Sequence, residues 1–263
     1  MNSIIVARNG AIATVTLNRP TALNALSPEM NLELSEATLR LEMDASVRCV
    51  VLQGAGDHFM AGGDVKGFSE ASPDRQERKI MLERGIAETH TIITRLRRMP
   101  KPVIASVQGA VAGFGVSLMS ACDLVIAADT SFFTLAYCHI GTSPDGGATY
   151  ALPRTTGTKL AMEIALLGDR FDAQRALALG LINRITPVAE LAAATAQLAA
   201  RLAAGPTAVY GRTKRLINTS LEHTLAAQLQ AEQDNFVASA LDDDFSEGVR
   251  AFVEKRKPTF VGH

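Results

Sequence analysis

Residues 101–121, KPVIASVQGAVAGFGVSLMSA, decide the fold. Val103–Val107 is a mostly apolar run of strand length, and glycines follow it at positions 109, 113 and 115. A short apolar run bounded by turn residues predicts a buried strand. The apolar residues after the glycines predict a helix near Gly113–Ala121, so the chain passes from strand to helix within a few residues. Strands that alternate with helices are typical of an α/β fold.

Short strands are predicted on both sides of this stretch. Ser3–Arg8 and Ala11–Leu17 flank Asn9-Gly10, a residue pair typical of a β-hairpin turn. Cys49–Gln53 and Leu124–Ala128 are apolar runs of the same kind, and they predict two more buried strands. The first two thirds of the chain therefore consist of short strands with helices between them.

Two helices are predicted between these strands. Ser27 is a typical N-cap residue and Pro28 suits the first helical position, so a helix is expected from there to about Met43. Residues Gln76–Met99 are polar and periodic, and Pro100 ends this second helix.

The pattern changes after Pro187, where helices follow one another without strands. They are predicted at Glu190–Ala203, Pro206–Leu221, Leu225–Leu241 and Phe245–Lys255. We therefore expect an α/β core over residues 1–195 and a C-terminal helical region over residues 196–263. No Ser/Gly linker separates the two, so the helical region is expected to pack on its own core or on a neighbouring subunit.

Composition excludes several classes of protein. The 263 residues include 26 basic and 27 acidic side chains, which does not favour a nucleic-acid partner. The cysteines, Cys49, Cys122 and Cys138, form no CxxC pair, so neither a disulfide framework nor a cysteine metal site is expected. The most apolar stretch is interrupted by glycines and Gln108, which argues against a membrane span. We expect a cytoplasmic protein.

Two glycine-rich turns are candidate ligand sites. Ala61-Gly62-Gly63-Asp64 follows a strand, and its glycines let the backbone approach a ligand closely. The alternative is a plain turn in which Asp64 caps the next helix. Gly113-Phe114-Gly115 opens a helix, where free N–H groups can hold a phosphate or an oxyanion; the alternative is close packing of the helix on a strand. A dinucleotide-binding turn would need a third glycine in place of Leu118.

A third loop, Ser143-Pro144-Asp145-Gly146, places a carboxylate in a geometry fixed by proline and glycine. Asp145 suits a general acid/base or a nucleophile. The alternative is an N-cap for the segment that runs to Pro153.

These motifs together resemble the enoyl-CoA hydratase/isomerase (crotonase) family over essentially the whole chain. Leu17-Asn18-Arg19-Pro20 followed by Asn24-Ala25-Leu26 is similar to its opening signature, and the two glycine turns are similar to its two oxyanion loops. Lys101–Ala105, Cys122-Asp123 and the C-terminal segment 247–258 also match. The resemblance implies an α/β fold: a crotonase-like spiral of repeated β-β-α units with a C-terminal helical region that serves in trimerisation.

The resemblance also implies what the chain binds and how. The backbone amides of Gly63 and Phe114 would hold a thioester oxyanion. Contacts to the coenzyme A part of an acyl-CoA substrate would fall on Leu23, Ala25, Ala61, Asp64 and Val65. Phe252 and Lys255 resemble a pair that relatives present to the nucleotide of an adjacent subunit, so a homotrimer or hexamer is expected. No separate cofactor is implied, because coenzyme A is part of the substrate.

Two departures from the family pattern bear on the reaction. Hydratases of the family hold and activate water with two glutamates, and the matching positions here carry Ser117 and Tyr137. Both are poor proton acceptors near neutral pH, so efficient hydration is not expected. We expect these two residues and His90 to line the substrate pocket. A single carboxylate, Asp145, can move one proton from C2 to C4 of an acyl chain.

The loop at 143–146 resembles that of Δ3,Δ2-enoyl-CoA isomerases and of the ring-rearranging isomerase of phenylacetate degradation. The expected activity is therefore that of an enoyl-CoA isomerase of fatty acid or phenylacetate catabolism.

Other functions stay open. One is enoyl-CoA hydratase activity with Asp145 and a water bound at Tyr137. Another is a 4-chlorobenzoyl-CoA dehalogenase or thioester hydrolase, in which Asp145 is the nucleophile and His90 the base; a lone helical histidine is otherwise a surface or packing residue. A third, RNA binding, occurs in some proteins of this fold, and the balanced charge argues against it.

Overall fold

The computed structural model describes residues 2–69 and 72–263, and its main sheet has six strands in the order β1-β2-β3-β4-β6-β9. The strands are β1 (Ile4–Asn9), β2 (Ile12–Leu17), β3 (Cys49–Gly54), β4 (Val103–Val107), β6 (Leu124–Ala128) and β9 (Arg184–Thr186). β1 and β2 form the predicted antiparallel hairpin, and every other neighbouring pair is parallel. The predicted strands are therefore confirmed, and β9 is an addition.

A second, smaller sheet has the order β5-β7-β8, formed by β5 (Ala110–Ala112), β7 (Phe132–Thr134) and β8 (Phe171–Asp172). β4 is followed by β5 and then by helix α4 (Phe114–Ser120), and β6 is likewise followed by β7. This succession confirms the expected spiral of β-β-α units. The expectation of a simple glycine turn before α4 was wrong, because Ala110–Ala112 pairs with β7 as a strand.

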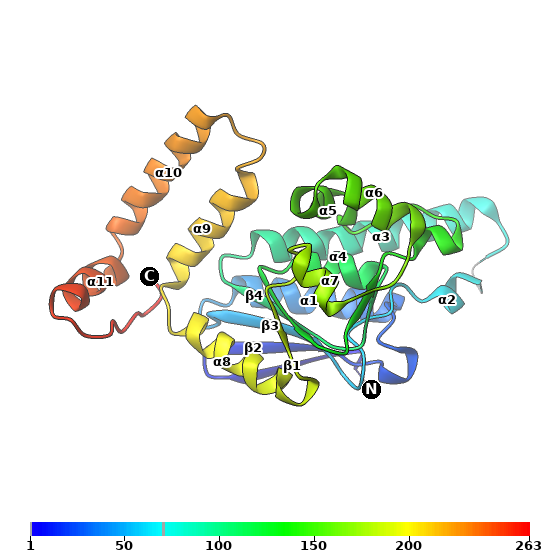
Figure 1. Cartoon of the computed structure of the whole chain (residues 1–263), viewed down its shortest axis with the longest axis horizontal. Helices are drawn as coiled ribbons and strands as arrows, with labels where there is room; N and C mark the ends of the chain where they lie inside the picture. Colours follow the sequence, from blue (N-terminus) through cyan, green and yellow to red (C-terminus); the bar gives the residue numbers. More distant parts are fainter. Residues whose placement is uncertain (1, 70–71) are drawn as a thin grey trace.

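Helices cover both faces of the main sheet, as Figure 1 shows. Side chains alternate between the faces of a strand. On one face Val50 and Leu52 pack in a cluster with residues of α1 (Pro28–Met43) and α3 (Arg75–Arg98). On the other face Cys49 and Val51 pack against α8 (Leu191–Ala203). A sheet buried on both faces explains why its strands are apolar throughout rather than alternating with polar residues.

The start of α1 follows the sequence prediction in detail. Ser27 is the N-cap, its side chain accepts a hydrogen bond from the backbone N–H of Met30, and Pro28 occupies the first turn. The remaining helices of the core are α2 (Val65–Ser69), α5 (Ala148–Thr156), α6 (Thr158–Leu167) and α7 (Ala173–Ala178), with short 3-10 helices at Pro20–Ala22, Tyr137–Ile140 and Val188–Glu190.

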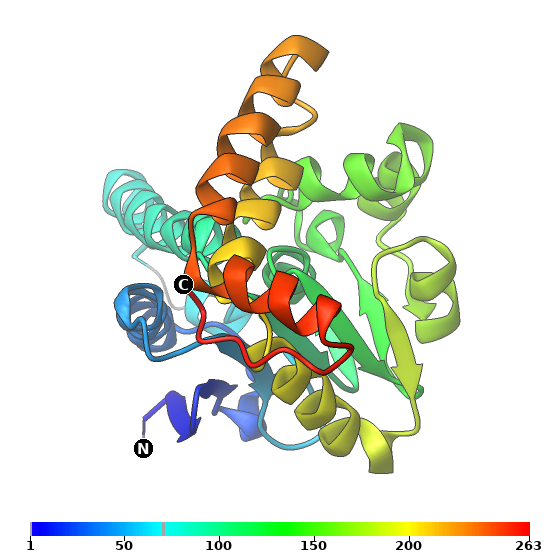
Figure 2. The same ribbon diagram turned by 90° about the vertical axis from the view of Figure 1, so that its left-hand side faces the viewer.

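Three C-terminal helices extend away from the core. α9 (Thr207–Thr219) and α10 (Leu225–Ala240) form an antiparallel pair, and α11 (Asp243–Val253) lies at the end of the pair where α9 begins (Figures 1 and 2). Residue 195 lies within α8, which packs on the sheet, so the helices that leave the core begin with α9. In the described part of the chain no helix combines the length and apolarity needed to cross a lipid bilayer.

The turn between β4 and β5 depends on Gly109. Its φ is +55°, and a Cβ at this position would lie 2.1 Å from the carbonyl oxygen of Asp57. Gly10, in the hairpin turn, has a similar φ of +57° but no heavy atom within 4 Å of the Cβ position. Gly10→Ala should therefore cost only the conformational strain, about 1–2 kcal/mol of unfolding free energy.

Gly109→Ala should cost at least about 4 kcal/mol, because backbone atoms must also move. Urea unfolding of the two variants measures the difference. Equal losses of stability would contradict the proposed overlap with Asp57.

Candidate active site

Backbone hydrogen bonds join the first glycine loop to strand β5. The N–H of Met60 donates to the carbonyl of Ala110 at 3.1 Å, and the N–H of Ala112 donates to the carbonyl of Met60 at 2.9 Å. Met60 and Val111 thus form a parallel bridge, which extends the small sheet by one residue. Gly63 and Phe114 are 51 positions apart in the sequence, and these bonds hold their two loops as neighbours.

The two loops touch at their glycines. A Cβ on Gly62 would lie 3.4 Å from the carbonyl oxygen of Ala112, and a Cβ on Gly113 would lie 3.4 Å from the Cα of Gly62. Both glycines have positive φ, +101° and +50°. The residues that follow them are Gly63 and Phe114, the two expected oxyanion donors.

The backbone N–H groups of Gly63 and Phe114 donate no hydrogen bond to any residue within 2–69 and 72–263. Phe114 opens α4, and the first N–H groups of a helix have no acceptor within it. Its side chain is buried. Two unpaired donors on adjoining loops suit an oxygen that gains negative charge during a reaction.

The residues expected to contact coenzyme A lie together along the first loop. The N–H of Ala61 donates to the carbonyl of Leu23 at 3.0 Å, and the N–H of Asp64 donates to the carbonyl of Leu26 at 3.1 Å. Segment 23–26, which contains Ala25, therefore runs beside segment 61–64. The side chains of Leu23 and Val65 are exposed, so this edge is open to a ligand.

A buried amide holds segment 23–26 in place. Asn24 is fully buried, and its Nδ2 donates to the carbonyls of Ala55 at 2.9 Å and His58 at 2.7 Å. Its Oδ1 accepts from the N–H of Arg19 at 2.9 Å. The sequence shows the motif around Asn24 but does not show that this side chain is buried. Sequence reasoning therefore assigned this residue no structural role.

The side chain of Asp64 is used structurally. Its Oδ1 accepts from the N–H of Gly67 at 3.2 Å, at the start of α2, and its Oδ2 pairs with Arg19 at 3.0 Å. These bonds, with the one from Gly67 first, hold the pKa of Asp64 below its usual value. The interpretation of Asp64 as a helix cap is therefore confirmed, and any contact of this residue with a ligand involves a carboxylate that is already bonded.

Asp145 lies beside both Tyr137 and Ser117. The hydroxyl of Tyr137 donates to Oδ1 of Asp145, and the hydroxyl of Ser117 donates to the backbone carbonyl of Asp145 at 2.8 Å. Burial, and then the charge of Asp145, raise the pKa of Tyr137 far above its usual value, so the phenol stays protonated. Asp145 does not cap α5, because Gly147 is the N-cap residue there and no side chain bonds to the cap. The N-cap interpretation was wrong.

The Asp145 loop also packs against the second glycine loop. A Cβ on Gly146 would lie 2.7 Å from the ring of Phe114 and 2.9 Å from Cβ of Ser117. The fold therefore brings Asp145 next to α4, whose first residue carries one of the free N–H groups.

His90 lies on the other side of this loop. The backbone N–H of Gly146 donates to Nε2 of His90 at 3.4 Å, and the imidazole is exposed. This weak bond occupies the lone pair that a general base at His90 would use. The arrangement favours a packing role for His90 over a catalytic one.

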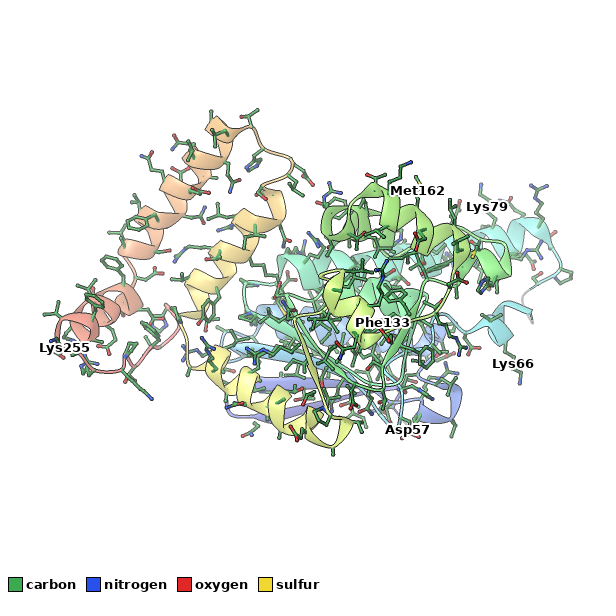
Figure 3. The ribbon with its side chains drawn as sticks, in the orientation of Figure 1. Asp57, Lys66, Lys79, Phe133, Met162 and Lys255 are labelled. Atoms are coloured by element: carbon green, nitrogen blue, oxygen red, sulfur yellow. The ribbon has the colours of Figure 1, made fainter. Side chains whose placement is uncertain are left out.

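Phe252 and Lys255 do not approach the site within one chain. They lie at the end of α11, and Figure 3 shows Lys255 at the opposite end of the molecule from Lys66, which follows Val65 at the open edge. Phe252 is 85% exposed. Any contact of these two residues with a ligand in the site described above would involve a neighbouring subunit.

Known proteins are similar to this chain in sequence and in fold. A family model described as enoyl-CoA hydratase/isomerase matches residues 7–263. The 1,2-epoxyphenylacetyl-CoA isomerase of Escherichia coli (strain K12) is 38% identical over 252 residues, which is 95% of each chain. The mitochondrial enoyl-CoA hydratase of Pongo abelii is 36% identical over 254 residues, covering 96% of this chain and 84% of that protein.

Solved structures of enoyl-CoA hydratases have the same fold as this chain. An enoyl-CoA hydratase from Polaromonas sp. JS666 superposes with a TM-score of 0.92 at 36% identity, over 98% of this chain and 99% of that chain. An enoyl-CoA hydratase from Bacillus anthracis superposes with a TM-score of 0.93 at 29% identity, over 99% of this chain and 100% of that chain. With its family model, its relatives and its crotonase fold in agreement, the chain belongs to the enoyl-CoA hydratase/isomerase family.

Proposed function

We propose that this enzyme shifts the double bond of an enoyl-CoA thioester, with Asp145 carrying the proton. The proposal is carried by one observation. At the two positions where hydratases of the family place glutamates, this chain has Ser117 and Tyr137, and both hydroxyls donate hydrogen bonds to Asp145. Tyr137 donates to the carboxylate and Ser117 to the backbone carbonyl, and a protonated hydroxyl that donates in this way is a poor proton acceptor near neutral pH. Asp145 remains as the proton acceptor of this cluster.

The reaction needs one base and one oxyanion site. In a 3-enoyl thioester the carboxylate of Asp145 removes a proton from C2, and the electron pair moves onto the thioester oxygen. The N–H groups of Gly63 and Phe114 stabilise this dienolate; one such donor contributes about 3–4 kcal/mol in comparable sites. The protonated Asp145 then returns the proton to C4, which leaves the double bond between C2 and C3. No water is added or lost.

Tyr137 has a positioning role in this proposal. Its protonated hydroxyl bonds Oδ1 of Asp145, which leaves Oδ2 to exchange the proton with the substrate. A hydrogen bond to a charged group contributes about 1.5–3 kcal/mol.

Relatives of this chain include an enzyme named 1,2-epoxyphenylacetyl-CoA isomerase and one named enoyl-CoA hydratase, so hydration is the second candidate. An incubation experiment distinguishes isomerisation from hydration. The enzyme is incubated with cis-3-enoyl-CoA and, separately, with trans-2-enoyl-CoA, and the products are separated by chromatography and identified by mass spectrometry. Isomerisation leaves the mass unchanged, whereas hydration adds one water. An aromatic epoxide thioester tests the ring-rearranging reaction in the same assay.

We also propose that the enzyme is a homotrimer or a dimer of trimers. The C-terminal helices expose large apolar side chains, among them Leu225, Phe236 and Leu241, and a groove of about 630 Å³ lies between α9, α10 and α11. Apolar surface of this extent marks an interface. Sedimentation velocity should give three or six chain masses, and a monomer would contradict the assembly.

Asp145→Asn should lower kcat for isomerisation by about 100- to 10,000-fold, because amide nitrogen and oxygen cannot shuttle the proton. Binding of a saturated acyl-CoA should survive, since the two N–H groups are unchanged. Asp169→Asn, on an exposed loop, is the matched control and should keep wild-type rates. Full activity of Asp145→Asn would refute the assignment.

Tyr137→Phe should lower kcat by about 10- to 100-fold with little change in KM, because the carboxylate loses the bond that fixes its orientation. Steady-state kinetics on the same 3-enoyl substrate measure both constants. A rise in KM with kcat unchanged would mean that Tyr137 only lines the pocket.

A further inference from the structure

A pocket of about 390 Å³ lies directly behind the Asp145 loop, between α3, α4, α5 and α9. Its inner end is formed by Ser117 and Gly146, which adjoin Asp145. Ile93, Ala121 and Ala151 provide apolar walls. The pocket therefore adjoins the backbone of the Asp145 loop and continues away from it.

The outer end of the pocket is cationic. Arg97 and Arg215 both line it, from α3 and α9 respectively. Arg97 is half-buried, donates to Oδ1 of Asn218 at 2.7 Å, and lies over the ring of Tyr150 at 5.1 Å from its centroid. Arg215 donates to Oδ1 of Asn235 at 3.0 Å. These amide partners orient the guanidinium groups and carry no charge of their own. Arg97 also lies close enough to Asp123 for its charge to oppose the rise that burial causes in the pKa of that carboxyl.

Other basic side chains near the pocket form ion pairs with carboxylates, unlike Arg97 and Arg215. Arg98, which also lines the pocket, forms an ion pair with Glu42 at 2.8 Å, and Lys214, beside Arg215, pairs with Asp123 at 2.8 Å. Across the described residues, no carboxylate lies within ion-pair distance of Arg97 or Arg215.

Two further charged residues contact Tyr150, which lines the pocket. Glu222 accepts a hydrogen bond from the hydroxyl of Tyr150 at 2.7 Å, and the guanidinium of Arg154 covers the ring at 3.5 Å from its centroid. Glu222 and Arg154 carry opposite charges, so together they add no net charge beside Tyr150. The excess positive charge inside the pocket remains available to an anion.

Two helices lead from the reacting centre to the arginines. Ser117 lies one turn beyond Phe114 on α4, and Ala121 lies one turn further. On α3, His90 contacts Gly146, Ile93 follows on the next turn, and Arg97 on the turn after that. Seven residues of helix rise by about 10 Å, which is roughly the length of an extended eight-carbon chain.

We propose that this pocket receives the far end of the acyl group and that this end carries a carboxylate, held by Arg97 and Arg215. The substrate class is then the coenzyme A monothioester of an unsaturated dicarboxylic acid. Planar guanidinium groups bind carboxylates through paired hydrogen bonds, and the apolar walls suit the intervening methylene groups. This inference rests on the proposed function, because it requires a thioester at Gly63 and Phe114.

Binding of saturated thioesters tests the inference without requiring isomerisation. Isothermal titration calorimetry of the full-length protein should show that suberyl-CoA, the C8 diacid monothioester, binds at least about tenfold more tightly than octanoyl-CoA. Equal affinities, a preference for octanoyl-CoA, or binding of neither would overturn the inference. A preference for suberyl-CoA in a protein without isomerase activity would refute the proposed function and leave the carboxylate site standing.

Variants assign the preference to its residues. Arg97→Met should reduce the ratio of the two affinities to near one, and Arg97→Lys should retain part of it. Arg201→Met, which removes an exposed charge from α8, is the matched control and should keep the wild-type ratio. Equal weakening of both thioesters by Arg97→Met, with the ratio preserved, would show a structural role at the α3–α9 contact and overturn the assignment.

Discussion

The bridge between Met60 and strand β5 is the contact on which the site depends. Two backbone hydrogen bonds, from Met60 to Ala110 and from Ala112 back to Met60, fasten a loop after β3 to the small sheet that follows β4. Each bond contributes only about 1 kcal/mol to folding. Their effect on geometry is larger, because they bring Gly62 against the backbone at Gly113. The two loops that carry the free N–H groups are therefore held as neighbours. Donors fixed before the substrate arrives need no reorganisation during the reaction.

The residues around this bridge serve to keep it rigid. Gly109 has no room for a side chain beneath the carbonyl of Asp57, and the buried amide of Asn24 fixes the segment that pairs with the first loop. Gly146 then packs on Phe114, which couples the position of Asp145 to that of the second N–H group. The carboxylate and the two free N–H groups are thus parts of one packed unit. A displacement of either loop would move all three groups, which explains the number of glycines and buried polar side chains in this region.

Sequence reasoning predicted the larger elements well and the smaller ones poorly. Apolar runs of five residues and a capped, periodic helix carry a strong local signal, and β3, β4, β6 and α1 agree with it. β5, β7 and β8 have only two or three residues, too few to show a period, and their pairing is set by partners distant in the sequence. For the same reason the family motif located Asp145, but nothing local to residue 137 indicated that the Tyr137 hydroxyl would reach that carboxylate. Likewise Asp64 was placed near the ligand, while its bonds to Arg19 and Gly67 depended on the fold.

The directions of the hydrogen bonds around Asp145 favour the proposed isomerisation over hydration. A hydratase site must hold a water molecule between proton acceptors. Here the hydroxyls of Ser117 and Tyr137 are both committed as donors, one to the backbone and one to the side chain of the same aspartate. Burial and the aspartate charge keep the phenol protonated, so Tyr137 cannot act as a base near neutral pH. A water molecule bound among these groups would contact one carboxylate, which already accepts a hydrogen bond from Tyr137. Neither of the two glutamate positions would provide a second base. The proposed isomerisation needs only that one carboxylate, which takes a proton from C2 and returns it to C4, and the dienolate between these steps is the species that the N–H groups of Gly63 and Phe114 would hold.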